Sequence, residues 1–192
     1  MSTISKSKTV PITDKLCQGD VFQDVKYCYI DSEDEEGLDI IEYTFPYAII
    51  ISQACDTTSA SDLVSSKSGK ATKYMPSLLL CPIYDEQSTI KTEHLEKIFE
   101  SEDLSIVKEG MFNKDERHIA QLDMHYRFHN LTIKKNDNSD LLIGLIDFKH
   151  YFTLPVKHLL NNRDKRLVRL EDIFAEQITL KYCAYLARVA IP

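Results

Sequence analysis

Four consecutive apolar residues, Ala48 to Ile51, lie inside the segment Tyr47–Ser52. Successive side chains of a strand point to opposite faces of a sheet, so an unbroken apolar run cannot alternate between solvent and core. Such a run is typical of a central strand that is buried on both faces. We therefore expect Tyr47–Ser52 to be an interior strand that brings the polar residues after it to the rim of a curved sheet.

The rest of the chain predicts further strands and one loop. Segments rich in β-branched and aromatic residues predict strands at 19–30, 38–45, 75–85, 118–133 and 140–154. Pro46 is expected to interrupt the strand before it, and Pro82 to mark a strand exit or an edge position, because proline cannot donate a ladder hydrogen bond. The Ser/Thr/Lys-rich segment 56–74 is expected to be an exposed loop.

Two segments have the apolar spacing of helices. They are an inserted stretch at about 92–117 and a C-terminal segment at about 170–190. The predicted fold is therefore α+β: a small, strongly bent β-barrel or sheet with an inserted helical segment and a long C-terminal helix packed across it. We expect a polar N-terminal tail at 1–15 and a single domain at 16–192.

The charge is unevenly distributed along the chain. The net charge of −7 argues against a protein that coats nucleic acid non-specifically. Much of the negative charge lies in Asp31–Asp39, an expected hairpin loop, whereas the chain from Lys149 to its end has eight basic and four acidic residues. A local basic surface there is a candidate for contacts with phosphates or an acidic partner. Its residues are Arg163, Lys165, Arg166 and Arg169. The alternative is an ordinary solvated segment that its acidic neighbours partly neutralise.

The five cysteines are scattered, and none forms a C-x-x-C pair. This pattern indicates neither a disulfide framework nor a zinc ribbon, so we expect cytosolic thiols, most of them in or near the core. No stretch is long and apolar enough to span a membrane, and the N-terminus lacks the apolar core of a secretion signal. The sequence predicts a cytoplasmic protein, and it predicts no cofactor or metal.

Reactive residue types follow the central strand directly, at Cys55 and Asp56. A nucleophilic cysteine needs a lowered pKa, usually from a nearby imidazolium, and His125 or His129 would have to approach through the fold. The functional interpretation is a thiolate–histidine pair or Cys/Asp/His ligation of zinc. The structural interpretation places Cys55 in the core, with Asp56 capping the following turn.

The segment around Arg127 is a second candidate site. On a strand, His125, Arg127 and His129 would point to one face, and two histidines flanking an arginine could bind phosphate or a carboxylate. A polar outer face above the aromatic inner face of Tyr126 and Phe128 explains the same spacing without a ligand.

The order "QGDVF", acidic loop, "FPYAIIIS", polar loop and "MPSLLLCPI" resembles the toxin family that includes MazF and PemK. This resemblance covers roughly residues 18–84 and implies an SH3-like barrel, which often forms homodimers. Members that cleave RNA resemble one another in an arginine just before the Pro-led strand, where this chain has Phe45. They also tend to place Ser or Thr after the next apolar strand, where Ile83 and Tyr84 stand. The resemblance therefore implies the fold, while the ribonuclease residues are not matched.

The chain also resembles a group of bacterial proteins that share a Ser-Gln-x-Cys-Asp strand end and an Arg-Val-x-x-Pro tail. The matching residues are Ser52, Gln53, Cys55, Asp56, Arg188, Val189 and Pro192. We include Ser52 and Gln53 among the candidate binding residues on this basis. The resemblance implies no activity.

Three functional hypotheses follow. The first is a toxin-like barrel module, without intact ribonuclease residues, that acts in bacterial stress response or defence by binding a protein or RNA, with the loop at Ser61–Tyr74 as its binding edge. The second is a hydrolytic or metal-assisted enzyme centred on Cys55 and Asp56 with a histidine. The third is an RNA endonuclease toxin.

Overall fold

The computed structural model describes residues 7–8, 15–34, 37–66, 71–90, 123–134 and 141–189. The expected helical insertion at 92–117 and nearly all of the expected N-terminal tail lie outside these residues. The described strands are β1 (Ser7–Lys8), β2 (Asp20–Asp34), β3 (Gly37–Ile50), β4 (Ser77–Asp85), β5 (Phe128–Lys134), β6 (Leu141–Asp147), β7 (Phe152–Pro155) and β8 (Arg166–Leu170). The described helices are α1 (Ala54–Ser66), α2 (Glu86–Ile90), α5 (Val156–Asn161) and α6 (Asp172–Val189), with 3-10 turns η1 (Ala71–Lys73), η3 (Phe148–His150) and η4 (Arg163–Lys165).

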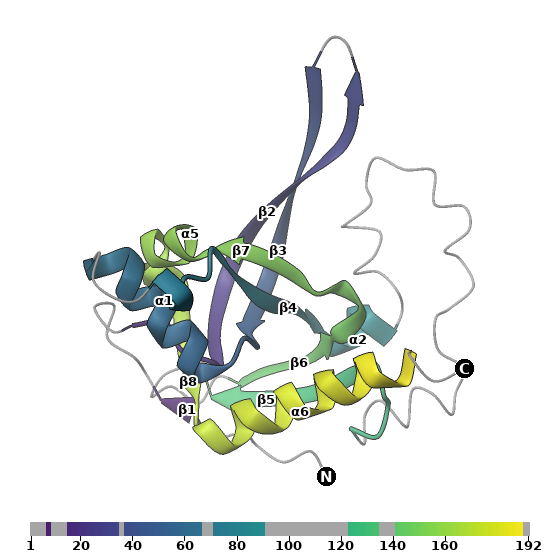
Figure 1. Ribbon diagram of the computed structural model, residues 1–192. Coiled ribbons are helices and arrows are strands. Elements are labelled where there is room, and N and C mark those ends of the chain that lie inside the picture. Colours follow the sequence, from purple (N-terminus) through teal and green to yellow (C-terminus); the bar gives the residue numbers. More distant parts are fainter. Residues whose placement is uncertain are drawn as a thin grey trace.

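The fold is α+β. The described strands form one antiparallel sheet in the order β1-β8-β2-β3-β4-β6-β5, and β7 pairs with the first half of β4. The order runs from one end to the other without closing, so these strands make an open sheet. Helices α1 and α5 lie on one side of the sheet, and α6 lies along the other (Figure 1).

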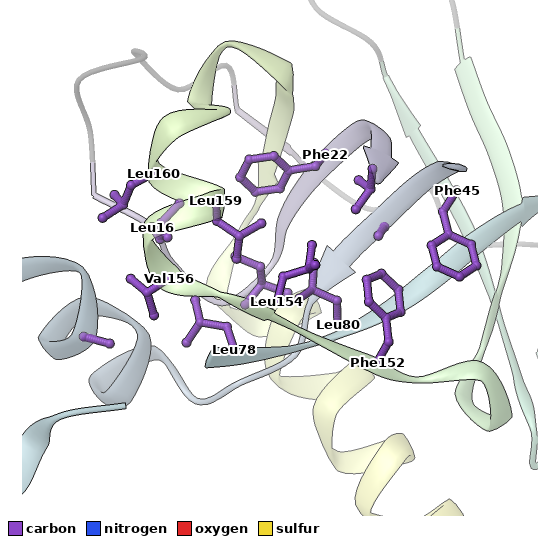
Figure 2. Close-up of a cluster of buried hydrophobic side chains, with 14 of the residues drawn as sticks. Leu16, Phe22, Phe45, Leu78, Leu80, Phe152, Leu154, Val156, Leu159 and Leu160 are labelled. Carbon is purple, nitrogen blue, oxygen red and sulfur yellow. The ribbon is translucent and has the colours of Figure 1, made fainter. Parts of the chain in front are cut away.

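The segment expected to be an interior strand is one. Ala48, Ile49 and Ile50 have no exposed surface, and β3 lies between β2 and β4. Ala48 and Ile50 belong to the hydrophobic cluster under α1 and α5, part of which Figure 2 shows. Ile49 and Ile51 belong to the cluster under α6. Because alternate residues meet different clusters, each residue of the run has an apolar environment.

Both prolines lie inside strands, where the sequence predicted an interruption and an edge. Pro46 is exposed within β3, opposite Asp24, whose φ of +48° marks an irregularity in the ladder with β2. Pro82 is buried within β4. On the side of β4 away from β3, the pairing with β7 ends at Leu80 and the pairing with β6 begins at Ile83. Each proline therefore stands where the ladder is locally interrupted, which explains how the strands continue through it.

The predicted loop at 56–74 is wrong for residues 56–66, which form most of α1. Thr57, Ala60 and Ser61 are buried and Val64 packs on the core. These positions have the spacing i, i+3, i+4, i+7 of one helix face. Two of the four are small polar residues, so the periodicity is invisible to a search for apolar residues. The Thr57 hydroxyl donates to the Gln53 carbonyl oxygen at 2.9 Å, which satisfies its buried oxygen.

Strands β2 and β3 are much longer than their neighbours and form a hairpin that projects beyond the sheet (Figure 1). We call its outer part, Lys26–Asp34 and Gly37–Thr44, the hairpin arm. Its register pairs Tyr27 with Tyr43 and Ile30 with Ile40. The acidic segment that the sequence placed in a loop is therefore largely β-strand.

Candidate functional site: an aromatic pocket

A pocket of about 300 Å³ lies where the hairpin arm leaves the sheet. Its lining consists of aromatic rings from β2, β3, β4 and the segment that joins η3 to β7. The lining residues are Tyr27, Tyr29, Tyr43, Phe45, Tyr84, His150, Tyr151 and Phe152. This volume is at the lower end of the range for small-ligand sites.

The register of the hairpin assembles one wall of the pocket. Tyr27 is directly opposite Tyr43, and Tyr29 and Phe45 each lie two residues away along one of the strands. Residues that are opposite or two apart point to the same face of a sheet, so these four rings share a face. The Tyr29 and Tyr43 rings are stacked with centroids 5.3 Å apart, and their hydroxyl oxygens lie 3.0 Å apart in a hydrogen bond.

The back of the pocket is formed by rings that also belong to the core. Phe45 and Phe152 are stacked with centroids 4.6 Å apart, and both are labelled in Figure 2. Tyr27 lies 5.1 Å from Phe152 at an interplanar angle of 52°, and Tyr84 meets Phe45 edge-on at 65°. Because Phe45, Tyr84 and Phe152 are almost completely buried, the inner part of the pocket is held rigidly by core packing.

A buried polar network fixes the remaining side of the pocket. His150 Nδ1 lies 3.1 Å from the Tyr84 hydroxyl and 3.2 Å from Asp147 Oδ2. Asp147 is fully buried, and it accepts bidentate hydrogen bonds from Arg127, from Nε at 2.8 Å and from Nη2 at 2.6 Å. The Lys149 backbone N–H also donates to Asp147, at 3.0 Å. A carboxylate can only accept, so the arrangement favours the tautomer in which His150 Nδ1–H donates to Asp147.

Burial keeps His150 and Tyr84 of the lining neutral near pH 7. Burial lowers the pKa of His150; Asp147 opposes this effect, while Arg127 and Lys149 add to it. Burial raises the pKa of Tyr84, with a further contribution from Asp147. The carboxylate that His150 contacts, Asp147, is itself paired with Arg127, so these two formal charges compensate each other. The pocket is therefore an aromatic, uncharged hollow.

The surroundings of the pocket are acidic. Between the two facing tyrosines, Tyr27 and Tyr43, the chain has seven acidic residues and no basic residue. Asp39 is exposed and lies opposite Ser32 in the hairpin. Residues two apart on a strand point to the same face, so Asp39 lies on the face of the arm that carries Tyr43. The pocket thus opens beside a strongly negative arm.

Cys55 and Asp56 lie apart from this pocket, in the first turn of α1. Both side chains are exposed, so the expectation that Cys55 lies in the core is wrong. The hydrogen-bonding neighbours of Cys55 Sγ are Asp56 Oδ1 at 3.7 Å and Gln53 Oε1 at 3.9 Å. The expectation that most of the five cysteines lie in or near the core is also wrong, since Cys28, Cys55 and Cys183 are exposed and only Cys81 is buried. The catalytic role of Cys55 and Asp56 stays a prediction.

Ser52 has a structural role and Gln53 is exposed. The Ser52 hydroxyl accepts a 2.8 Å hydrogen bond from the Leu79 backbone N–H, which joins the end of β3 to β4. The Gln53 side chain is exposed at the start of α1. The polar pair after the central strand thus extends the contact between β3 and β4 and leads into helix α1.

The three residues expected on one strand face have separate environments. Strand β5 begins at Phe128, so His125 and Arg127 precede it. His125 stacks on Tyr126, with ring centroids 4.7 Å apart. Arg127 does bind a carboxylate, but this carboxylate is the internal Asp147.

His129 belongs to a different group of charges. Its Nδ1 lies 3.1 Å from Asp123 Oδ2, and Asp123 Oδ1 also lies 2.6 Å from Lys181 Nζ of α6. Burial raises the pKa of Asp123, but the hydrogen bonds from His129, Lys181 and the Asn130 backbone outweigh it and lower the pKa overall. This group ties the start of β5 to α6.

Two of the four residues of the predicted basic surface, Arg166 and Arg169, are buried. Arg169 Nε lies 2.6 Å from Asp20 Oδ1, and Arg166 Nη1 lies 3.1 Å from Asp20 Oδ2. Asp20 is fully buried, and Arg166 and Arg169 are 8 % and 9 % exposed. Both arginines also donate to the Lys15 carbonyl oxygen. Neither the phosphate-binding nor the solvated interpretation fits residues that are buried in this way.

The other two basic residues are half-buried and donate to backbone carbonyl oxygens. Arg163 Nε donates to Leu160 at 2.9 Å, and Lys165 Nζ donates to Asp24 at 3.2 Å. They are reachable from solvent, but they are not among the residues that line the pocket. A binding role for them stays a prediction.

The sequence does not predict the pocket, because the residues that line it come from separate segments of the chain. One signal was available in the sequence. Aromatic residues stand at every second position on two segments separated by an acidic stretch, and this pattern predicts an aromatic face on a hairpin. These residues are Tyr27 and Tyr29 on the first segment, and Tyr43 and Phe45 on the second. Nothing in the sequence indicated that Tyr84 and His150 would complete it.

The described residues contain no group of three His, Cys, Asp or Glu side chains able to hold a metal ion. The described helices include none with the length and apolar character needed to cross a membrane. Comparisons of the chain with family models, with curated proteins and with solved structures found no match.

Proposed function

We propose that this protein is a binding module that recognises a basic segment of a partner protein through the aromatic pocket and the hairpin arm. The observation that supports this proposal is the combination of an uncharged aromatic pocket with a hairpin arm that carries five acidic residues and one basic residue, Lys26. The acidic residues are Asp31, Glu33, Asp34, Asp39 and Glu42. Aromatic residues in a pocket are frequent anchors of protein interfaces, and a charged surface beside them steers a partner of opposite charge.

A protein partner fits these observations better than RNA does. RNA binding relies on basic side chains that contact phosphates, and the pocket lining contains neither lysine nor arginine. The acidic arm would repel a phosphate backbone. Of the basic residues that the sequence singled out, Arg127, Arg166 and Arg169 are committed to internal carboxylates.

The wider setting of the proposal comes from the resemblance to the MazF and PemK family. On that basis we propose a toxin-like module that is related to SH3-like barrels and acts in bacterial stress response or defence. We propose that it does so without intact ribonuclease residues. The sequence predicted the binding edge at 61–74, but Ser61 is buried in α1. We therefore propose the hairpin arm as the binding edge instead.

The test is binding of a lysine-rich peptide and of a single-stranded oligouridine to wild-type protein and to variants. The pocket variant is Tyr27→Ala with Tyr43→Ala, and the matched control is Tyr74→Ala, an exposed tyrosine outside the pocket. We expect the peptide to bind the wild type and the control equally, and the pocket variant at least about tenfold more weakly. Tyrosine emission is a convenient signal because the chain has ten tyrosines and no tryptophan.

Two outcomes would contradict the proposal. One is peptide binding that the pocket variant does not change, and the other is oligouridine binding that it abolishes. If the double alanine variant fails to fold by circular dichroism, Tyr27→Leu with Tyr43→Leu removes the rings and keeps apolar volume at the site.

The enzyme hypothesis centred on Cys55 and Asp56 remains a second proposal, because the exposure of Cys55 leaves its thiol reachable by a substrate. Thiol titration of the wild type and Cys55→Ala, together with elemental analysis for zinc, separates the two proposals. A thiol no more reactive than Cys28 or Cys183, also exposed, and a metal-free protein would eliminate the enzyme.

A further inference from the structure

We propose that the aromatic pocket binds a methylated or quaternary ammonium group, which within the proposed function would belong to a methylated lysine of the partner protein. This inference rests on the proposed function for the identity of the partner, and on the pocket alone for the chemistry of the group. The chemistry follows from the orientation of the rings, the surrounding charge and the hydrogen-bonding capacity of the lining.

The orientation of the rings suits a compact, rounded group. A flat base or ring needs two nearly parallel rings with a gap of roughly 7 Å, twice the ordinary carbon–carbon contact distance. The nearly parallel pairs here are already in contact, with centroids 5.3 Å apart for Tyr29 and Tyr43 and 4.6 Å apart for Phe45 and Phe152. Other pairs are inclined, by 52° for Tyr27 and Phe152. Inclined rings offer their faces from several directions.

The charge around the pocket favours a cation. The face of an aromatic ring carries partial negative charge, so a cation within about 6 Å of a ring centroid is attracted to it. The adjoining arm adds a negative field through the exposed carboxylates of Asp31, Glu33 and Asp39, while Glu42 is paired with Lys26. His150 does not oppose this field, because its burial keeps the imidazole neutral near pH 7. Arg127 does not oppose it either, since it is paired bidentately with Asp147.

The hydrogen-bonding capacity of the lining favours a methylated cation over a free ammonium or a guanidinium group. The lining consists of tyrosine, phenylalanine and histidine side chains, without a carboxylate. Tyrosine hydroxyls can accept hydrogen bonds, but those of Tyr29 and Tyr43 are bonded to each other and that of Tyr84 is bonded to His150. The lining therefore offers few acceptors for the three N–H groups of a lysine ammonium or the five of a guanidinium, and buried N–H groups without acceptors are costly. A quaternary ammonium group has none, and it is the ligand type that aromatic cages are known to accept.

The first experiment compares choline with its neutral carbon isostere, in which a tert-butyl group replaces the trimethylammonium group. Both are titrated by NMR into wild-type protein, the Tyr27→Leu/Tyr43→Leu variant and the Tyr74→Ala control. We expect choline to bind the wild type and the control about tenfold more tightly than the isostere does, as a cation–π contribution of this kind predicts. The pocket variant should lose this preference.

The second experiment distinguishes the sources of the group. A trimethyllysine peptide, the same peptide with unmodified lysine, and phosphatidylcholine vesicles are compared. Preference for the trimethyllysine peptide over its unmodified form, with no retention on vesicles, supports the inference in full. Retention on vesicles without this preference would overturn the assignment to a protein partner.

The results separate this inference from the proposed function. Equal affinity for choline and the isostere, or no binding of either at millimolar concentration, overturns the inference even if the lysine-rich peptide binds through the arm. Choline binding that depends on Tyr27 and Tyr43, without any binding of basic peptides, supports the ammonium site and overturns the proposed function.

Discussion

Replacing Asp20 by asparagine tests the buried ion pairs that join β2 to β8. Asp20 is fully buried, and its carboxylate lies 2.6 Å from Arg169 Nε and 3.1 Å from Arg166 Nη1. It also accepts a 2.9 Å hydrogen bond from the Cys17 backbone N–H. Asparagine has nearly the same shape, so the substitution removes the charge without creating a cavity.

The magnitude follows from what the substitution leaves behind. The Arg166 and Arg169 side chains are 1 % and 11 % exposed, so two guanidinium groups lose their carboxylate without gaining water. Removing one partner of a buried ion pair costs about 3–5 kcal/mol, because the other charge stays buried and uncompensated. For a domain with an ordinary stability of about 5–15 kcal/mol, this is a large fraction of the total.

The assay is urea unfolding followed by far-ultraviolet circular dichroism. The matched control is Asp62→Asn, which removes an exposed pair in which Lys15 Nζ lies 2.7 Å from Asp62 and the side chains are 58 % and 40 % exposed. The control should lose less than about 1 kcal/mol. A loss for Asp20→Asn that equals the loss for the control would refute the reasoning, since the buried pairs would then be no different from a surface pair.

Three further predictions concern single residues. Gly19→Ala should cost about 2–4 kcal/mol in urea unfolding, because its φ is +82° and a new Cβ would lie 2.8 Å from the Ala175 Cβ. Cys55→Ala should change the unfolding free energy by less than about 0.5 kcal/mol, since the side chain is exposed; a larger loss would contradict its placement. Burial lowers the pKa of His150, Arg127 and Lys149 lower it further, and Asp147 partly opposes them. His150 should therefore contribute to the free energy of unfolding in full above pH 6.5, and this contribution should be lost as the pH falls toward the folded-state pKa. Unfolding measured against pH should show this slope in the wild type and a smaller one in His150→Gln.

The sequence was informative where one physical effect dominated. The run Ala48–Ile51 predicted a strand with two buried faces, and β3 has this environment. The apolar spacing near 170–190 predicted a helix, and α6 spans Asp172–Val189. In both cases local pattern and tertiary burial agree, so the pattern alone was sufficient.

The sequence was misleading where tertiary contacts override local rules. Pro46 and Pro82 would disrupt a regular ladder, yet both lie where the ladder is already interrupted, by the positive φ of Asp24 and by the change of partner along β4. The sequence predicts a loop where helix α1 forms, because Thr57 and Ser61 are polar residues that are buried in the fold. Strand pairing and helix packing, which no single-sequence pattern contains, determine these outcomes.

The candidate site follows a similar logic. Arg127, Arg166 and Arg169 were singled out because arginine binds anions, and in the structure each one does so. Their anions are Asp147 and Asp20, which are fully buried carboxylates of the same chain. The sequence therefore predicted an external anionic ligand for these arginines. In the structure each arginine instead forms an ion pair with a buried carboxylate of the sheet.

This internal pairing determines what kind of ligand the surface can attract. Since the arginines near the sheet are neutralised by buried carboxylates, their charges contribute little field outside the protein. The carboxylates of Asp31 and Asp39 on the arm are exposed, and they contribute to the field that a ligand meets. The pocket beside them is lined by aromatic side chains without lysine or arginine, so its lining adds no positive charge that would weaken this field. An anionic ligand would therefore meet repulsion before it reached the rings, whereas a cation would be drawn along the arm to Tyr27 and Tyr43 and held there by their faces.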